Sequence, residues 1–449
     1  MAHHSGVVSP PGDRSARFSD QAPVNPTPAV LRTCEEAEAY VASVCFKHGP
    51  PSLVGVELEW LVHRRDQPAA WPDPAALAAA LGSHAPTTLV LASPAAPLPH
   101  GSLVTVEPGG QVELASIPAP DLGTLLSTVR ADSAELHRLL AAEGLYPIAE
   151  AADPVRPPRR ILDAPRYVAM EQCFDRIGSG GRSGMCSTAA VQVCLDAGEA
   201  VDVAARWAAL HALGPVLVAA FANSPRLHGR STGWKSTRMA CWLALDPWRT
   251  APPVSLDADP AAAWARRAMH TQLLCVRRDG AAWDAPAGMT FADWVRGALQ
   301  VPPTTDDLDY HLSTLFPPVR PHGHLEVRYI DAQRGPDWEL PLTLLASLLA
   351  NLSTIDAALA ACAPAIGRWT AAARFGLADR TLARCAATVF DLACAGLPAV
   401  GAPQEVVARL EEMTERYVLR GRCPADDEPA AAVHDLALHA PLGVSEVPR

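Results

Sequence analysis

The chain has 449 residues, of which 49% are hydrophobic and 19% charged, as expected for a soluble globular protein with a large core. Its formal net charge of −11 argues against a nucleic-acid-binding protein, which usually carries a basic face. The eleven cysteines form no CxxC pair and no zinc-type cluster, so we expect buried free thiols in an intracellular protein.

The two ends of the chain differ from its middle. Residues 1–32 are rich in Pro and Ser, show no periodicity and lack the apolar stretch of an export signal, so we expect a disordered tail and a cytoplasmic protein. After Cys423 the sequence turns to Pro, Ala, Asp and Glu, which predicts a mobile tail over residues 424–449. Residues 33–423 should therefore form one continuous domain.

Helical periodicity marks four segments of this domain. Thr33 and Glu36 have the form of a capping box, and Asp121 is the expected N-cap of the second helix. The predicted ranges are 33 to about 49, 121 to about 143, 200–221 with an interruption at Gly214-Pro215, and 340–361. The apolar tract 340–366 contains Asn351, Ser353 and Asp356, which favours a buried or amphipathic helix over a membrane span.

Strand-like stretches between the helices place carboxylates at alternate residues. Glu57 and Glu59 share one face of the stretch 55–60, while their apolar neighbours share the other. No Lys or Arg interrupts this stretch to relieve the repulsion between the two charges. A hard divalent cation would relieve it and leave room for nucleotide phosphates, so the pattern predicts an enzyme that uses ATP and Mg²⁺.

A second acidic stretch surrounds a predicted turn. Glu107 leads into Pro108-Gly109-Gly110, and the departing strand carries Gln111 and Glu113 on one face. A Pro-Gly-Gly turn favours a hairpin or a tight bend, which would bring Glu107 back toward Gln111 and Glu113.

Two later strands continue the pattern. Gln192 lies on the polar side of the alternating stretch 191–196, and Glu326 and Arg328 share a face with His324 in the stretch 324–329. A glutamate two residues before an arginine suits a site in which the carboxylate binds a metal ion and the guanidinium binds phosphoryl oxygens. His324 is explained as readily by a structural role and is left out of the predicted site.

Each of these stretches has a simpler interpretation when it is taken alone. Alternating glutamates usually mark the solvated face of an antiparallel strand, and a Glu-x-Arg pair is more often a surface ion pair. Their clustering on strands with one polar face favours a metal–nucleotide site and predicts an antiparallel sheet that lines a cavity. Neither GxGxxG nor GxxxxGK[ST] occurs, which excludes the Rossmann and Walker nucleotide sites.

Six motifs follow one another in the order found in one enzyme family. They are Gly55–Glu59 (GVELE), Glu107–Leu114 (EPGGQVEL), Met185–Val193 (MCSTAAVQV), Phe221–Pro225 (FANSP), Tyr310–Arg320 (YHLSTLFPPVR) and Leu325–Arg328 (LEVR). Together they closely resemble the motifs of the glutamate–cysteine ligases of the plant and proteobacterial type, the GCS2 family. The resemblance spans roughly residues 33–420, and the segment 226–234 departs from the family pattern.

This resemblance implies an α+β fold related to glutamine synthetase, with an antiparallel sheet curved into a funnel and helices outside. It also implies an enzyme that joins the γ-carboxylate of L-glutamate to the amine of L-cysteine while ATP becomes ADP and phosphate. Residues 33–423 would be the catalytic domain. The implied partners are small molecules only, without nucleic acid or membrane.

The resemblance also implies roles for individual residues. Arg328 would stabilise the phosphoryl group during its transfer and, with Glu326, counts as catalytic. Gln192 lies where the family has a metal or nucleotide contact, and Arg238 resembles an arginine near the substrates. The implied Mg²⁺ ligands are Glu57, Glu59, Glu107, Glu113 and Glu326.

The composition, rich in Ala, Arg and Pro, is similar to that of high-GC actinomycetes, whose nearest family branch serves ergothioneine biosynthesis. We therefore expect γ-glutamylcysteine for that pathway. Two alternatives stay open: a related carboxylate–amine ligase with another amine acceptor, and a non-catalytic binding protein of the same fold. The second would be marked by the loss of metal-binding carboxylates, and none of the motif carboxylates is lost.

Overall fold

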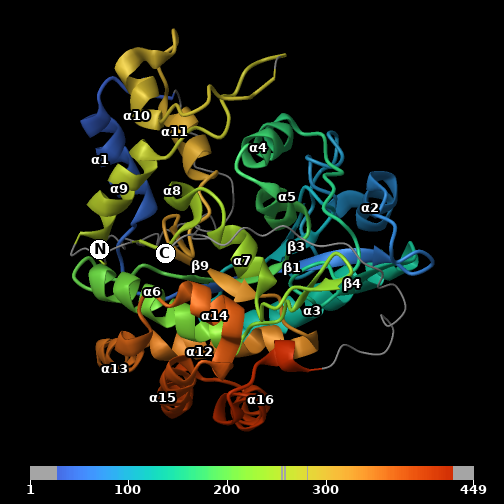
Figure 1. Cartoon of the computed structure of the whole chain (residues 1–449), viewed down its shortest axis with the longest axis vertical. Coiled ribbons are helices and arrows are strands. Elements are labelled where there is room, and N and C mark those ends of the chain that lie inside the picture. Colours follow the sequence, from blue (N-terminus) through green and yellow to red (C-terminus); the bar gives the residue numbers. More distant parts are fainter. Residues whose placement is uncertain (1–27, 254–255, 257–258, 281, 428–449) are drawn as a thin grey trace, which may run out of the picture.

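An open antiparallel sheet lies at the centre of the protein (Figure 1). The computed structural model describes residues 28–253, 256, 259–280 and 282–427. The seven strands follow the order β2-β3-β1-β5-β9-β8, with β4 paired to β1. They are β1 (Val54–Arg64), β2 (Leu103–Val106), β3 (Val112–Ala115), β4 (Leu145–Ile148), β5 (Ala190–Leu195), β8 (Val319–Pro321) and β9 (Leu325–Asp331). The predicted antiparallel sheet is confirmed.

The central strand β1 shows why the sheet has one polar face. Val56, Leu58 and Trp60 are buried, whereas Glu57 and Glu59 between them are partly exposed on the opposite face. Because successive side chains of a strand point to opposite faces, the sequence pattern places every apolar residue of this stretch on the core side. The alternation predicted from the sequence is confirmed.

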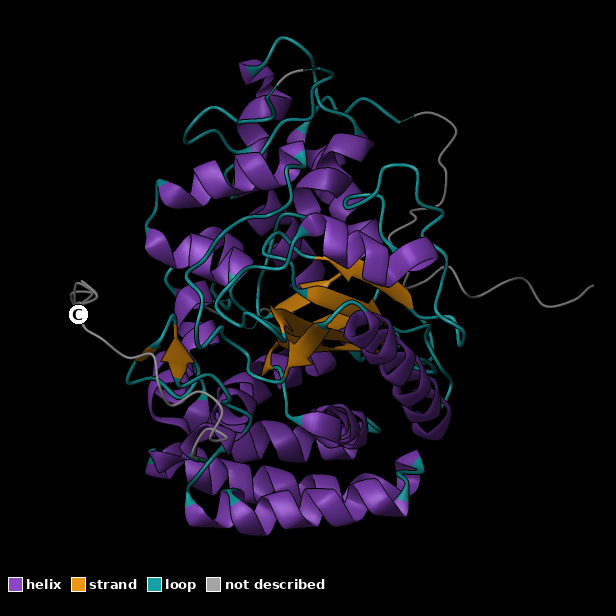
Figure 2. Ribbon diagram, turned by 90° about the vertical axis from the view of Figure 1, so that its right-hand side faces the viewer, coloured by secondary structure: helices purple, strands orange, loops and turns teal. Residues whose placement is uncertain are grey.

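Helices cover the apolar face of the sheet, with a further layer of helices outside them (Figures 1 and 2). The hydroxyl of Tyr329 on β9 donates a 3.0 Å hydrogen bond to the carbonyl of Leu210, which ties the sheet to the helix formed by Val203–Ala220. The helices of this side are α3 (Leu122–Ala142), α6 (Val203–Ala220), α12 (Glu339–Leu348), α13 (Leu352–Cys362), α14 (Trp369–Phe375), α15 (Arg380–Gly396) and α16 (Gln404–Arg416).

The remaining helices lie toward the polar face and the edges of the sheet (Figure 1). They are α1 (Cys34–Cys45), α2 (Pro74–Leu81), α4 (Pro165–Asp175), α5 (Ser179–Cys186), α7 (Thr237–Leu243), α8 (Pro247–Thr250), α9 (Pro260–His270), α10 (Phe291–Asp293) and α11 (Thr305–Leu312). A small hairpin is formed by β6 (Arg226–Leu227) and β7 (Arg230–Ser231). Single turns of helix lie at 82–84, 294–298, 335–338, 363–365, 376–378, 397–400, 418–420 and 424–426.

Two of the four predicted helices differ from the sequence prediction. The expected interruption at Gly214-Pro215 is wrong, because α6 continues through Pro215. Pro215 is itself buried in a mostly buried helix, and Gly214 leaves space that the ring of Trp369 fills. The single helix expected over 340–361 is also wrong. The side chain of Asn351 caps a new helix by accepting from the backbone of Thr354, so the chain bends by 112° between α12 and α13.

The other two helices begin where they were predicted. The side chain of Thr33 accepts from the backbone of Glu36 at the start of α1, and Asp121 caps α3 in the same way. The first helix ends at Cys45, a turn earlier than the predicted stop.

The described parts of both ends pack against the domain. The backbone N–H of Leu31 donates to the carbonyl of Pro303 at 2.9 Å, and Leu31 is buried. At the other end, Asp426 forms an ion pair with Lys235. The rest of the two predicted tails, residues 1–27 and 428–449, lies outside the described residues.

Within the described chain, two helices have the length and composition of a membrane span: Val203–Ala220 and Arg380–Val400. In the first, 83% of the apolar window is buried inside the protein, as expected of a core helix behind a sheet. The expectation of a cytoplasmic protein without a membrane partner stays a prediction.

Candidate active site

Pairing between neighbouring strands gathers the predicted site residues on the polar face of the sheet. Glu57 on β1 lies across from Gln192 on β5, and Glu59 lies across from Glu113 on β3. Further along β5, Cys194 lies across from Glu326 on β9. Residues that face each other across an antiparallel pair project from the same side of the sheet. Four strands therefore place their polar side chains around one region.

The Pro-Gly-Gly turn forms the predicted hairpin. The backbone N–H of Glu107 donates to the carbonyl of Gln111 at 2.8 Å, so the turn closes directly after β2. The backbone of Gly109 packs so closely on the carbonyl of Cys186 that a Cβ atom would overlap it. This contact fixes the hairpin against the segment that leads into β5. Glu107 is thereby returned toward the acidic strands, as the sequence predicted.

Hydrogen bonds connect the carboxylates across the strands. The amide nitrogen of Gln192 donates to Glu59 at 2.9 Å and to Glu113 at 3.2 Å, so it bridges two carboxylates. The backbone N–H of Ala190 donates to the other oxygen of Glu59 at 2.9 Å. The hydroxyl of Thr105 donates to Glu113 at 2.7 Å. Each of these donors fixes one oxygen of a carboxylate that would otherwise rotate.

The electrostatics of this cluster favour a bound cation. Burial, followed by the charge of Glu107, raises the pKa of Glu59 from 4.5 to about 7. Burial also raises the pKa of Glu113 well above its usual range, and the charges of Glu57, Glu107 and Glu59 add to the effect. A carboxylate whose pKa is raised in this way carries a net electrostatic cost when it is ionised. A metal ion would remove that cost.

Arginines dominate the opposite edge of the site. Arg320 on β8 donates to both oxygens of Glu326, and Arg328 donates to one of them. Burial alone would raise the pKa of Glu326, but the two guanidinium groups outweigh it and hold the pKa well below its usual range. Glu326 is therefore ionised and engaged by arginines, in contrast to the raised pKa values of Glu59 and Glu113.

Arg238 reaches the site from a different element. It lies in α7, is buried, and donates to the backbone carbonyl of Arg328 at 2.6 Å. Its Nε atom is buried without a hydrogen-bond partner among the described residues. Burial lowers the pKa of Arg238, while the charges of Asp331 and Glu59 act in the opposite direction. The structure thus places both predicted arginines beside each other.

The donor set of the cluster fits Mg²⁺. This ion prefers oxygen ligands, and Glu57, Glu59, Glu107 and Glu113 supply carboxylates from three neighbouring segments of the sheet. The side-chain oxygen of Gln192 is buried without a hydrogen-bond partner in the described part of the chain, which leaves it available to a cation. In the part of the chain that the structure describes, no three or more His, Cys, Asp and Glu side chains are already arranged so that they could hold a metal ion. Some acidic side chains would therefore have to turn for an ion to bind.

Three residues near the site were not assigned from the sequence. Thr105 could have been found from its place two residues before Glu107, since alternate strand residues share a face. The position of Arg320 depends on how β8 pairs with β9, and that of Asp331 on how β9 pairs with β5. Local sequence carries no signal for either pairing.

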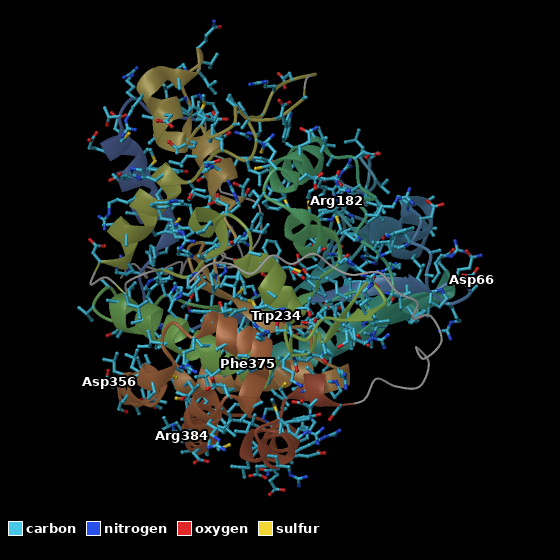
Figure 3. The ribbon with its side chains drawn as sticks, in the orientation of Figure 1. Asp66, Arg182, Trp234, Asp356, Phe375 and Arg384 are labelled. Carbon is cyan, nitrogen blue, oxygen red and sulfur yellow. The ribbon has the colours of Figure 1, made fainter. Side chains whose placement is uncertain are left out.

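The segment 226–234, which departs from the family pattern, contains the β6–β7 hairpin. It ends at Trp234, which lies beside Phe375 (Figure 3). The guanidinium of Arg374 stacks over both rings at 5.8 and 5.5 Å from their centroids. This end of the segment is thus held by α14.

Carboxylates and arginines gather on one face of an antiparallel sheet, a combination of groups that could hold a metal ion and phosphate. A sequence profile of "Glutamate-cysteine ligase family 2 (GCS2)" matches residues 53–435. The chain therefore belongs to this family and is a ligase.

Individual relatives agree with this assignment. The chain is 38% identical over 426 residues to the glutamate–cysteine ligase EgtA of Mycolicibacterium smegmatis, covering 91% of this chain and 96% of that protein. It is 39% identical over 400 residues to the EgtA of Mycobacterium tuberculosis strain H37Rv, covering 87% and 88%. The chloroplastic glutamate–cysteine ligase of Nicotiana tabacum is 33% identical over 244 residues, which cover 52% of this chain and 46% of that protein.

Among solved structures, the fold is similar to that of a glutamate–cysteine ligase from Francisella tularensis in complex with AMP. The TM-score is 0.50, the identity is 14%, and the match covers 85% of this chain and 84% of that chain. The expected fold class is confirmed, with a sheet that remains open.

Proposed function

We propose that residues 33–423 catalyse the ATP-dependent joining of the γ-carboxylate of L-glutamate to the amine of L-cysteine, which gives γ-glutamylcysteine for ergothioneine biosynthesis. The observation that carries this proposal is the acidic cluster with raised pKa values next to Arg238 and Arg328. It is supported by the similarity to EgtA proteins over about nine-tenths of the chain.

A carboxylate is a poor electrophile until it is phosphorylated. The reaction would therefore pass through a γ-glutamyl phosphate, with the phosphoryl group coming from ATP and the amine of cysteine displacing phosphate. Transfer of a phosphoryl group depends mainly on positioning and on neutralisation of charge. Arg328 would stabilise the transferring group. Arg238 donates to the backbone carbonyl of Arg328 and keeps an Nε atom without a hydrogen-bond partner among the described residues.

The proposed Mg²⁺ ligands are Glu57, Glu59, Glu107 and Glu113, together with Glu326, and Gln192 is a metal or nucleotide contact. Bound Mg²⁺ would neutralise phosphate charge and orient the nucleotide. The protein's own contribution is to orient two of these carboxylates. Glu59 accepts from Gln192 and from the N–H of Ala190, and Glu113 accepts from the hydroxyl of Thr105. Glu326 is engaged by Arg320 and Arg328, so as a metal ligand it would have to share an oxygen with a guanidinium.

The test is ADP release by the purified protein with ATP, Mg²⁺ and glutamate, with and without cysteine, followed by mass analysis of the product. Cysteine-dependent ADP release with γ-glutamylcysteine as the product is the expected result. ADP release that requires glutamate but does not give this product would indicate that the acceptor is an amine other than cysteine. A comparison of kcat/KM among amines would then identify it. No turnover with any amine would overturn the proposal.

A further inference from the structure

The strand β9 contains an irregularity that changes which residues face the site. Cys194 on β5 pairs with Glu326, and Ala190 pairs with Asp331, with a register shift between Val191 and Val193. Cys194 and Ala190 are four residues apart and share a face, whereas Glu326 and Asp331 are five apart and would lie on opposite faces of a regular strand. The extra residue of the bulge therefore turns Asp331 to the same face as Glu326.

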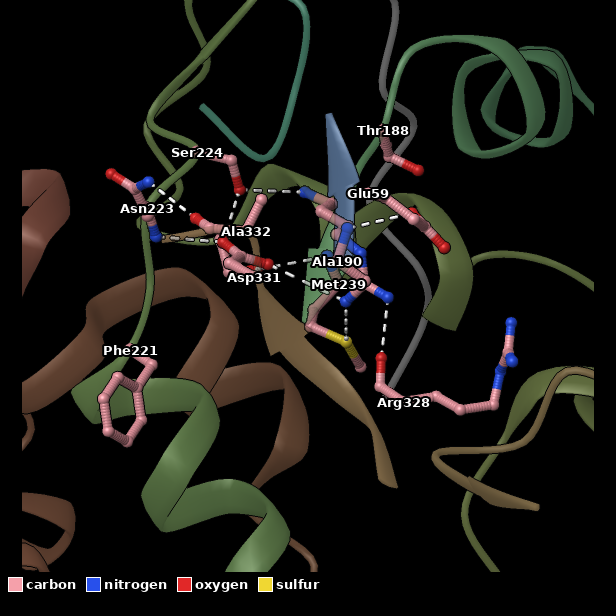
Figure 4. A network of polar contacts seen from close by, with 12 residues as sticks. Glu59, Thr188, Ala190, Phe221, Asn223, Ser224, Met239, Arg328, Asp331 and Ala332 are labelled. Atoms are coloured by element: carbon pink, nitrogen blue, oxygen red, sulfur yellow. Dashed lines mark hydrogen bonds and ion pairs between the residues drawn. The ribbon is translucent and has the colours of Figure 1, made fainter. Parts of the chain in front are cut away.

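Asp331 is fully enclosed there and accepts hydrogen bonds from two loops (Figure 4). One oxygen accepts from the backbone N–H of Asn223 at 2.9 Å and from the hydroxyl of Ser224 at 2.7 Å. The other oxygen accepts from the hydroxyl of Ser236 at 2.9 Å. The nearest opposite charge is Nη1 of Arg238, at 3.9 Å.

The two serines connect Asp331 to the start of α7 by further hydrogen bonds. The hydroxyl oxygen of Ser224 accepts from the backbone N–H of Arg238 at 3.2 Å, and that of Ser236 accepts from the backbone N–H of Met239 at 3.2 Å. Each serine hydroxyl carries a single proton, and in these bonds it donates that proton to Asp331. The lone pairs of both hydroxyls are then left to face the first N–H groups of the helix.

We propose that Asp331 is a positioning residue for the ligase reaction, which holds Arg238 against the backbone of Arg328 through Ser224 and Ser236. Asp331 touches no predicted metal ligand in the hydrogen bonds described above, and its effect on the reaction is carried by Arg238. The inference rests on the proposed role of Arg238 near the substrates.

The variant Asp331→Asn tests the inference because it keeps the shape of the side chain. The amide replaces one acceptor oxygen with a donor, so one serine proton loses its acceptor, and the charge that faces Arg238 disappears. We expect kcat/KM for glutamate and ATP to fall by roughly 10- to 100-fold, the range seen when a residue that orients a site residue is removed.

Asp132→Asn is the matched control. Asp132 is also a buried carboxylate and accepts from the backbone N–H groups of His100 and Ser102, at 2.9 and 3.0 Å, but it contacts no predicted site residue in these bonds. This variant should lower the melting temperature without changing kcat/KM.

A double-mutant cycle with Arg238→Lys separates positioning from general loss of structure. If Asp331 acts through Arg238, Asp331→Asn should cost less than about 3-fold in the Arg238→Lys background, because the two changes damage the same interaction. The inference would be overturned if the fold-losses of kcat/KM in the two single variants multiply in the double variant, or if Asp331→Asn leaves kcat/KM unchanged.

If Asp331→Asn does not fold, Ser224→Ala and Ser236→Ala replace it in the same cycle, since each removes one of the two connections. Multiplying losses or unchanged kinetics in these variants would again overturn the inference. An inactive wild-type protein would instead count against the proposed function, so the two failures are distinguishable.

Discussion

Arg320 on β8 lies directly across from Glu326 on β9 and donates hydrogen bonds of 2.7 and 2.9 Å to the two oxygens of its carboxylate. Glu326 is almost completely buried, with a side chain that is 2% exposed. This pair and Arg328 form an arginine-rich side of the site, and the carboxylates around Glu59 and Glu113 form an acidic side.

Arg320→Met should destabilise the protein, because it leaves a buried carboxylate with one guanidinium partner in place of two. Removal of one partner of a buried ion pair typically costs about 3 kcal/mol or more. Urea unfolding without metal measures this loss. If Glu326 also binds Mg²⁺, the ion should raise the melting temperature of the variant by more than that of the wild type.

The control for this variant is Arg64→Met, which breaks the exposed pair with Asp66. Exposed pairs contribute less than about 1 kcal/mol, so its unfolding curve should nearly match that of the wild type. An Arg320→Met protein as stable as this control would contradict the structural role of the pair.

The raised pKa of Glu59 predicts how stability changes with pH when no metal is present. Between pH 4.5 and about 7 the folded protein retains a proton that the unfolded chain releases. The contribution of Glu59 to the free energy of unfolding is therefore fully present below pH 4.5 and is lost as the pH rises through about 7. A shift of this size corresponds to a loss of about 3 kcal/mol. Glu113, whose pKa is also raised, changes stability in the same direction.

The measurement is the free energy of unfolding at pH 5 and pH 8, with and without Mg²⁺. Glu59→Gln should remove much of the difference between the two pH values. Mg²⁺ should restore stability mainly at pH 8, because metal ligands must be deprotonated to bind. A wild-type protein whose metal-free stability changes between pH 5 and pH 8 by the same amount as that of Glu59→Gln would contradict the assignment.

The sequence could predict the parts of the site that depend on local geometry. Glu57 and Glu59 share a face because a strand alternates side chains, whatever lies beside it. The turn after Glu107 follows from Pro-Gly-Gly alone, and its hairpin is present. Both predictions needed only the residues next to one another in the chain.

The parts that could not be predicted depend on pairing between distant strands. Asp331 faces the site only because of the register shift between β5 and β9, and Arg320 reaches Glu326 only through the β8–β9 pairing. The break between α12 and α13 has a local cause instead. The sequence prediction places Asn351 inside one helix, although its side chain caps the second helix. The roles of the predicted site residues in binding and catalysis stay predictions.

Glu57→Gln should lower ADP release by roughly 100-fold, the usual scale for removal of a group that stabilises charge in a reaction. The change also removes one of the charges that raise the pKa of Glu113, so the metal-free protein should be at least as stable as the wild type. A coupled ADP assay and a thermal melt measure the two effects. Glu135→Gln, which changes a surface carboxylate paired with Arg138, is the control and should keep full activity. Full activity of Glu57→Gln would contradict the site.

Gly109→Ala tests whether the hairpin must pack closely on the segment before β5. The added Cβ atom would overlap the backbone carbonyl of Cys186, and a backbone atom cannot swing away as the end of a flexible side chain could. Overpacking of this kind typically costs about 1–3 kcal/mol. Because the hairpin carries Glu107 and Glu113, we expect ADP release to fall together with stability.

The comparison is Gly144→Ala, whose φ of +68° brings a strain of about 1 kcal/mol but whose Cβ would meet nothing within 4 Å. Gly144→Ala should therefore lose some stability and keep its activity, whereas equal activity in both variants would show that the position of the hairpin does not matter to the reaction.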